Sequence, residues 1–375
     1  MASATGSLVE DIRKLASERI APGAAAVDRD RAFPEGALRA LGEQGALGLL
    51  VPEASGGAGG GLSELVDACE VVGAACASSG MVFLMHSVTA ATIAAGGGDS
   101  ASEYLEKMAA GQLLGTLAFS ERGTGAHFYA PELTSQRQNG SVRISGRKSF
   151  VTSGGHAGLY LVLVRSDTGE GLDCYAVTGD AGVTFDGEWN GLGMAGNSSI
   201  PAQFDSVVDD AARIGDAGEG QALVFTAVAP FFLAGLAAVN VGIASAAQTA
   251  AIEHAASRRY GDGQALADIQ AIQHELADMD MTTRAARLVV NEAARLGDAG
   301  DEAALVALME CKIVATEAAT GVTQRALEVC GGQGYSRSLP IERHLRDARA
   351  GAVMAPTNGV LRNWIGKALA GLPVP

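Results

Sequence analysis

The chain has 375 residues, of which 48% are hydrophobic and 18% are charged, and its formal net charge is −15. This composition excludes a disordered chain and predicts two or three domains, or one large globule with subdomains. The acidic balance argues against nucleic acid as a partner, because phosphate binding needs a basic surface.

We expect no secretory signal and no apolar run that reaches the roughly 18 residues of a membrane span. Residues 222–251 form the most apolar run, but Pro230 and Asn240 interrupt it, so we predict a helix buried in a large core. The first 20 residues contain acids by position 10 and lack a cationic start followed by an apolar stretch. The cysteines lack metal-ligand spacing, which favours buried thiols in a reducing cytoplasm and no metal site.

Residues 1–113 are predicted to be helical. Residues 8–20 carry apolar side chains at i, i+3 and i+4, and residues 34–50 read as a helix followed by glycines. Residues 62–95 are nearly uncharged after Glu70, as expected of one long helix inside a bundle. Within it, His86 is predicted to be a core histidine rather than a catalytic one.

From 114 to 217 the hydrophobic period changes to that of strands. Residues 141–155, 159–167, 173–185 and 199–210 are short β-rich runs separated by Gly, Asp, Asn and Ser. This region predicts a small antiparallel β domain or a β-barrel-like domain.

From 218 to 375 the helical period returns. Residues 269–296 and 301–332 are long and amphipathic, and Gly-Asp turns separate the helices. Helices, then strands, then helices predict an α+β protein with three subdomains in series, at 1–113, 114–217 and 218–375.

Two segments of the β region could contact a ligand. Residues 117–128, "LAFSERGTGAHF", offer hydroxyls and backbone N–H groups, which suit either an anionic or heteroaromatic ligand or a plain turn. Phe150 and Thr152 are expected on one side of a strand, where Phe150 either stacks on a planar ring or packs in the core.

Residues 328–348, "EVCGGQGYSRSLPIERHLRDA", form the most specific segment. A helix is expected to end at Gly331 and Gly332, and a charged helix follows Pro340. The charges in that second helix would by default form a solvated surface of i, i+4 pairs. The following residues, 350–360, contain no ionisable side chain.

In their order along the chain, these segments resemble the acyl-CoA dehydrogenase family of flavoproteins. The resemblance rests on "GALGLLVPEASGGAG", "FSERGTGAH", "GRKSFVTSGGHA", "GLGMAGNSS", "IQAIQHELADM" and "GGQGYSRSLPIERHLRDA". It implies an N-terminal helical domain, a middle β-barrel-like domain and a C-terminal four-helix bundle. It also implies FAD as cofactor and a homotetramer or homodimer.

The resemblance assigns FAD contacts by position. They are Phe119, Ser120, Phe150, Thr152, Arg258, Arg259, Gln270, Glu328, Gly331, Gly332 and Thr357. Of these, Glu328, Gly331 and Gly332 match a stretch that lies against the FAD of a neighbouring subunit. Arg258 or Arg259 is expected to meet the pyrophosphate, which prefers a cation.

The substrate side departs from the family. Ala355 occupies the position of the usual catalytic glutamate, which removes the α-proton of the thioester, and Pro356 replaces a glycine. A methyl group cannot accept a proton, so Glu121 and His127 become the candidate bases. The expected substrate pocket consists of Ala126, Phe231, Phe232, Met354 and Ala355.

Three functions follow as hypotheses. The first is FAD-dependent oxidation of an acyl thioester, bound to CoA or a carrier protein, with a noncanonical or missing base. The second is an oxidase or monooxygenase in specialised biosynthesis, in which the reduced flavin reacts with O2 inside an apolar, water-excluding site. The third is a family member that binds a ligand without catalysis, which the flavin-contact residues Ser120, Thr152 and Thr357 disfavour.

Overall fold

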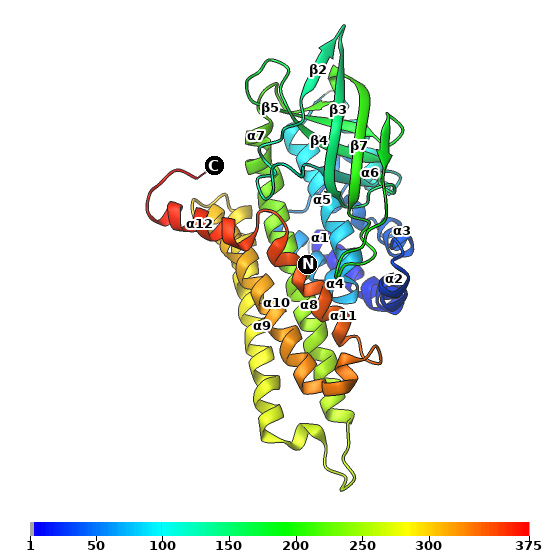
Figure 1. Ribbon diagram of the computed structural model, residues 1–375, viewed down its shortest axis with the longest axis vertical. Coiled ribbons are helices and arrows are strands. Elements are labelled where there is room, and N and C mark those ends of the chain that lie inside the picture. The colour runs from blue at the N-terminus through cyan, green and yellow to red at the C-terminus, as the bar shows by residue number, and fades with distance from the viewer. Residues whose placement is uncertain (1–3, 99, 375) are drawn as a thin grey trace.

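Helices form the first part of the computed structural model, which describes residues 4–98 and 100–374 (Figure 1). The α-helices are α1 (Ala4–Leu15), α2 (Ala24–Asp30), α3 (Glu35–Glu43), α4 (Leu62–Ala75), α5 (Ala77–Gly96) and α6 (Ala101–Ala109). The long helix predicted over 62–95 is two helices, because Cys76 adopts an extended backbone conformation between α4 and α5.

Helix α5 is buried along most of its length, and its own backbone accepts hydrogen bonds from three of its hydroxyls. The hydroxyls of Ser87, Thr89 and Thr92 each donate to the carbonyl four residues earlier, at 2.9, 2.8 and 2.7 Å. A hydroxyl buried without a partner would destabilise the fold, so these bonds let α5 cross the core. His86 is buried as predicted, with Nε2 2.9 Å from the Leu47 carbonyl oxygen.

Two four-stranded sheets follow, in the orders β1-β4-β5-β8 and β2-β3-β7-β6. The strands are β1 (Gly115–Ala118), β2 (Ser135–Gln138), β3 (Ser141–Val151), β4 (Leu159–Arg165), β5 (Leu172–Thr178), β6 (Val183–Phe185), β7 (Ile200–Asp209) and β8 (Arg213–Ile214). The prediction of an antiparallel domain is wrong for one pair, because β1 and β4 run parallel.

Strand β4 is buried on both faces and so joins the two cores. Tyr160 and Val162 pack between the sheets with Phe204, whereas Leu159 and Leu161 pack against the helices. Because successive side chains of a strand point to opposite faces, this strand reads as a continuous apolar run rather than an alternating one.

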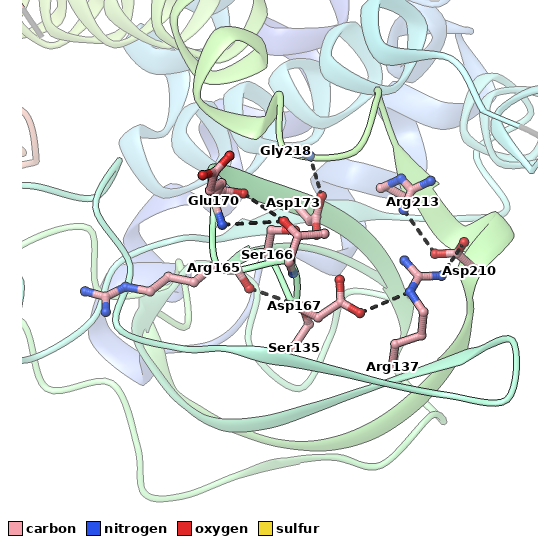
Figure 2. Close-up of polar contacts among 11 residues, drawn as sticks. Ser135, Arg137, Arg165, Ser166, Asp167, Glu170, Asp173, Asp210, Arg213 and Gly218 are labelled. Atoms are coloured by element: carbon pink, nitrogen blue, oxygen red, sulfur yellow. Dashed lines mark hydrogen bonds and ion pairs between the residues drawn. The ribbon is translucent and has the colours of Figure 1, made fainter.

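Charged side chains link strand β2 to the segments that follow β4 and β7 (Figure 2). Arg137 of β2 pairs with Asp167 after β4 at 3.0 Å and with Asp210 after β7 at 2.6 Å. Nearby, the buried carboxylate of Asp173 accepts a hydrogen bond from the Gly218 N–H at 2.9 Å, in the connection that leads into the last helices.

The remaining chain is helical, and its three longest helices run side by side (Figure 1). They are α7 (Gly220–Leu223), α8 (Ala229–Ser257), α9 (Gln270–Asp298), α10 (Ala304–Tyr335), α11 (Ile341–Val353) and α12 (Asn358–Leu369). Helix α10 continues past the predicted end at Gly331, but that residue interrupts it with φ 53° and ψ −136°. A positive φ favours glycine, which explains the residue type there.

The structure confirms the predicted α+β architecture of helices, sheets and helices. Helices give way to strands between Ala109 and Gly115, and strands to helices between Ile214 and Gly220. The exact domain limits at 113 and 217 stay a prediction.

Among the described residues, two helical stretches are long and apolar enough to cross a membrane by length and composition alone, namely Ala77–Gly96 and Gly220–Ser257. The expectation that no run reaches that length is therefore wrong. Their apolar windows are 83% and 67% buried inside the fold, as in core helices of globular proteins.

Candidate active site

A cavity of about 530 Å³ lies where the β strands meet α5, α8 and the connection between α11 and α12. Apolar side chains dominate its walls, and a few hydroxyls, one amide, one carboxylate and one guanidinium interrupt them. The lining residues used below are Met81, Met85, Phe119, Ser120, Glu121, Arg122, Ala126, Phe150, Thr152, Trp189, Met194, Asn197, Ser199, Phe232, Val353, Met354, Ala355 and Thr357.

Phe150 presents its ring to this cavity from a distorted strand end. The register of β3 against β7 shifts between Lys148 and Val151, and Phe150 adopts φ 52°. Its side chain is 69% exposed, so the interpretation of Phe150 as a core residue is wrong. The Trp189 ring stands perpendicular to it with the centroids 6.5 Å apart. This arrangement leaves an aromatic face open to a planar ligand.

Hydroxyl groups surround the same space. The buried Thr152 hydroxyl lies 2.9 Å from that of Ser199. Thr357 caps α12, where its Oγ1 accepts a hydrogen bond from the Val360 N–H at 3.3 Å, so its own proton is free to donate. Ser120 completes the set at the end of β1.

Glu121 does not have the environment of a free base. Its carboxylate pairs with the Lys148 ammonium at 2.6 Å and accepts from the N–H groups of Glu132 and Leu133 at 2.8 and 3.2 Å. Both side chains of the ion pair are buried. The carboxylate therefore holds the turn after β1 in place, and proton transfer to it would break this network.

His127, the other candidate base, is not among the residues that line the cavity. Its ring is exposed, with Nδ1 3.3 Å from the Thr124 carbonyl oxygen and its edge against Tyr129. Of the predicted substrate residues, Ala126, Phe232, Met354 and Ala355 line the cavity, whereas Phe231 does not. The described lining therefore contains no unpaired carboxylate or imidazole.

Helix α11 carries the Ala355 segment into the site, and it is more than a solvated charged surface. The buried Asp347 accepts a hydrogen bond from the Met194 N–H at 2.6 Å. Burial raises the pKa of Asp347 to about 6. Gly193 packs on the Arg346 backbone, where a side chain would collide with the carbonyl. These contacts fix α11 against the loop before β7.

The other residues predicted to contact FAD lie outside the cavity. Arg258 and Arg259 are exposed where α8 ends, at the end of the bundle opposite the sheets (Figure 1). Gln270, Glu328, Gly331 and Gly332 are exposed as well and do not line the cavity. Contact between these residues and the FAD of another subunit stays a prediction.

Sequence reasoning missed several lining residues. Met81 and Met85 lie one turn apart on α5, and nothing in a uniformly apolar helix distinguishes them beforehand. Trp189, Asn197 and Ser199 come from irregular segments around β6 and β7. Trp189 is one of two tryptophans in a chain with few aromatic residues. That rarity is the one signal in the sequence that could have singled it out.

The three parts of the chain match domains of known proteins. Residues 5–112, 116–207 and 234–370 match the N-terminal, middle and C-terminal domains of acyl-CoA dehydrogenase, respectively. The chain is 30% identical over 367 residues to an acyl-CoA dehydrogenase of Bacillus subtilis, covering 96% of each chain. It is 29% identical over 362 residues to the pig mitochondrial short-chain specific acyl-CoA dehydrogenase, covering 95% of this chain and 87% of that protein.

The structure is similar to that of butyryl-CoA dehydrogenase from Megasphaera elsdenii, with a TM-score of 0.92, 25% identity and 99% of both chains covered. Fold and cavity together define a flavoprotein oxidoreductase. The chain belongs to the acyl-CoA dehydrogenase family, whose members depend on FAD, and FAD is its cofactor. The residues present fit that group, because Phe150 offers an uncovered ring beside the hydroxyls of Thr152, Ser120 and Thr357.

Proposed function

We propose that this protein is an FAD-dependent oxidoreductase acting on an acyl thioester, carried by CoA or by a carrier protein, without a side-chain base at position 355. The observation that supports it most is the apolar cavity with an exposed Phe150 ring, flanking hydroxyls and Ala355 in its wall. When bound, FAD supplies a two-electron acceptor for the substrate Cα–Cβ bond.

In this proposal, one set of side chains holds the flavin and another set lines the space for the acyl group. Phe150 packs on the flavin ring, while Ser120, Thr152 and Thr357 donate hydrogen bonds that orient it. Met81, Met85 and Phe232 line the apolar space for the acyl group and exclude water, which strengthens the polar contacts that remain.

The α-proton needs an acceptor from outside this set. Glu121 is the acid among the described lining residues, and Lys148 and two N–H groups already engage it. A basic group of the substrate therefore accepts the α-proton. Positioned general bases contribute about 10²–10⁴-fold to rate, so thioesters with an unusually acidic α-proton are the preferred substrates.

An anaerobic titration tests this proposal. Purified protein loaded with FAD is mixed with acyl-CoAs of several chain lengths, some with an electron-withdrawing group that acidifies the α-proton, and flavin absorbance is followed. Bleaching by the acidified thioesters supports the proposal, whereas no bleaching by any thioester contradicts it. Protein that does not bind FAD would instead support a non-catalytic family member.

A second candidate is oxygen-using chemistry at the same site. The wall segment that contains Met354 and Ala355, together with Phe232, is apolar and lacks an acid. Such a lining disfavours simple deprotonation and suits a reaction from which water must be kept away. Incorporation of ¹⁸O from ¹⁸O₂ into product after admission of air establishes a monooxygenase, and hydrogen peroxide without incorporation establishes an oxidase.

We also propose a homotetramer or homodimer in the cytoplasm. Residues that the family resemblance places against FAD, such as Arg259 and Glu328, do not line the cavity of their own chain. Their use therefore needs a second copy. Light scattering of the FAD-loaded protein distinguishes the two assemblies, and a monomer that retains tight FAD binding would contradict both.

A further inference from the structure

Lys312 of α10 is a buried cation without a carboxylate partner. Its side chain is fully buried, and no ion pair involves it within residues 4–98 and 100–374. Its Nζ instead lies 3.3 Å from the Met354 carbonyl oxygen, 3.1 Å from that of Pro356 and 2.8 Å from Asn358 Oδ1. Two of these acceptors belong to the connection between α11 and α12, and the third is the first residue of α12.

The three acceptors match the three N–H donors of an ammonium group. Two of them flank Ala355, so the hydrogen bonds hold the cavity wall on both sides of the position where the family has its base. Met354 is also the C-cap residue of α11, and a cation is favourable beside the carbonyls of a helix C-terminus. The Asn358 Nδ2 donates in turn to Thr316 Oγ1 at 3.0 Å, which fixes the third acceptor.

We propose that Lys312 is a positioning residue whose three N–H donors hold the Met354–Thr357 wall of the cavity, and that loss of its proton releases this wall. A neutral amine has two N–H donors and a lone pair. One of the three oxygens then loses its donor and faces that lone pair. A buried acceptor without a donor destabilises its surroundings, so the segment moves away from Nζ.

No carboxylate near Lys312 is placed to keep its ammonium group protonated in the described residues. On α10 and α12, Glu317 pairs with Arg362 at 2.6 Å on the surface, and Glu310 is exposed. On α11, Asp347 is engaged by the Met194 N–H. Residues 229–252 of α8 contain no charged side chain. Burial alone lowers the pKa of Lys312 to about 7, so both protonation states are populated near neutral pH.

The sign of the effect separates it from global stability. The folded-state pKa of Lys312 lies below its ordinary value of 10.5, so between about pH 7 and 10.5 the unfolded chain binds more protons. This group therefore makes the whole fold more stable as pH rises, while the Met354–Thr357 wall loses a hydrogen-bond donor. Loosening of the wall without loss of global stability is the expected signature.

Amide hydrogen exchange of a peptide spanning residues 353–361 tests the proposal on the FAD-loaded protein. After correction for intrinsic rates, protection of the wild-type peptide should fall by about 10-fold between pH 6 and pH 8.5, the equivalent of one hydrogen bond. The same peptide of Lys312→Met should have low protection at both pH values. Arg362→Gln, which removes a surface charge between the same helices, should behave like wild type.

Equal protection of the wild-type peptide at both pH values would overturn the proposal, and so would a Lys312→Met peptide that stays as protected as wild type. If Lys312→Met does not fold, a titration of wild-type protein labelled with ¹³Cε-lysine decides. The chain has five lysines, so their signals can be assigned. A Lys312 midpoint above about pH 9, near the ordinary lysine value, would contradict release of the wall at neutral pH.

Discussion

The guanidinium of Arg346 donates hydrogen bonds of 2.8 and 2.7 Å to the two carboxylate oxygens of Asp28, which lies 318 positions earlier in the chain. The same guanidinium bonds Glu342 one turn back on α11 at 2.8 Å. The pair therefore fixes the helix that carries the Ala355 segment against α2 of the N-terminal helices.

Arg346→Gln should lower the free energy of unfolding by about 1–3 kcal/mol, because Asp28 keeps a half-buried charge without its bidentate partner. Burial by itself would raise the pKa of Asp28, but the hydrogen bonds and charge of Arg346 outweigh burial and hold that pKa below its ordinary value of 3.8. The stabilisation is thus present above pH 4 and is lost at lower pH. Denaturant unfolding at neutral pH measures it, with Arg343→Gln as the matched control. Equal effects of both substitutions would argue against the pair.

Asp347→Asn should make stability less dependent on pH. Burial raises the pKa of Asp347 from 3.8 to about 6, so the folded protein binds the extra proton between these values and the wild type loses stability as pH rises. The asparagine oxygen can still accept from Met194. Between pH 5 and 7.5 the free energy of unfolding of the variant should rise by about 1.4 kcal/mol relative to that of the wild type, the equivalent of one pKa unit. A stability difference that is the same at both pH values would contradict the account.

Glu121→Gln should destabilise the protein by about 3–5 kcal/mol, because it leaves the Lys148 ammonium buried without its counter-charge. The double variant Glu121→Leu, Lys148→Met should recover most of that loss, since it removes both charges. Thermal unfolding of the three proteins makes the comparison. If Glu121→Gln kept full stability while abolishing flavin reduction, Glu121 would be a base after all.

Phe150→Ala should weaken FAD binding by about 2–10-fold, the equivalent of one aromatic stacking contact, and leave stability nearly unchanged. The ring is already 69% exposed, so its removal opens no internal void. Fluorescence titration of the flavin-free protein measures the affinity. Leu192→Ala is the control, because that side chain is 66% exposed and does not line the cavity. Equal affinity of Phe150→Ala and wild type would place the flavin elsewhere.

The family resemblance assigned four residues of the site by position, and all four lie in the cavity wall. Ser120, Thr152 and Thr357 line the cavity, as does Ala355. Sequence reasoning failed where position depends on contacts distant in sequence. The bulge that exposes Phe150 depends on pairing with β7, and the cavity role of Trp189 depends on a loop held by Asp347 from α11. His127 could not be excluded beforehand, because only the folded loop shows that its ring lies outside the cavity.

The buried lysines show the same limit. Lys148 and Lys312 sit in segments whose charge alone suggests surface positions, yet both are fully buried. One neutralises Glu121 and the other holds three oxygens near Ala355. Lysine spacing does not distinguish these roles, because the partners come from elements 27 to 46 positions away.

The rate of anaerobic flavin reduction in Ala355→Glu tests the central claim most directly. The protein loaded with FAD is mixed with one acyl-CoA in a stopped-flow instrument, beside wild type and Ala355→Gln, which matches glutamate in size but is not a base. The account predicts that Ala355→Glu reduces flavin about 10²-fold or more faster than the other two, as expected of a newly positioned base. A wild type as fast as Ala355→Glu would contradict it, because the natural site would then already contain an efficient proton acceptor.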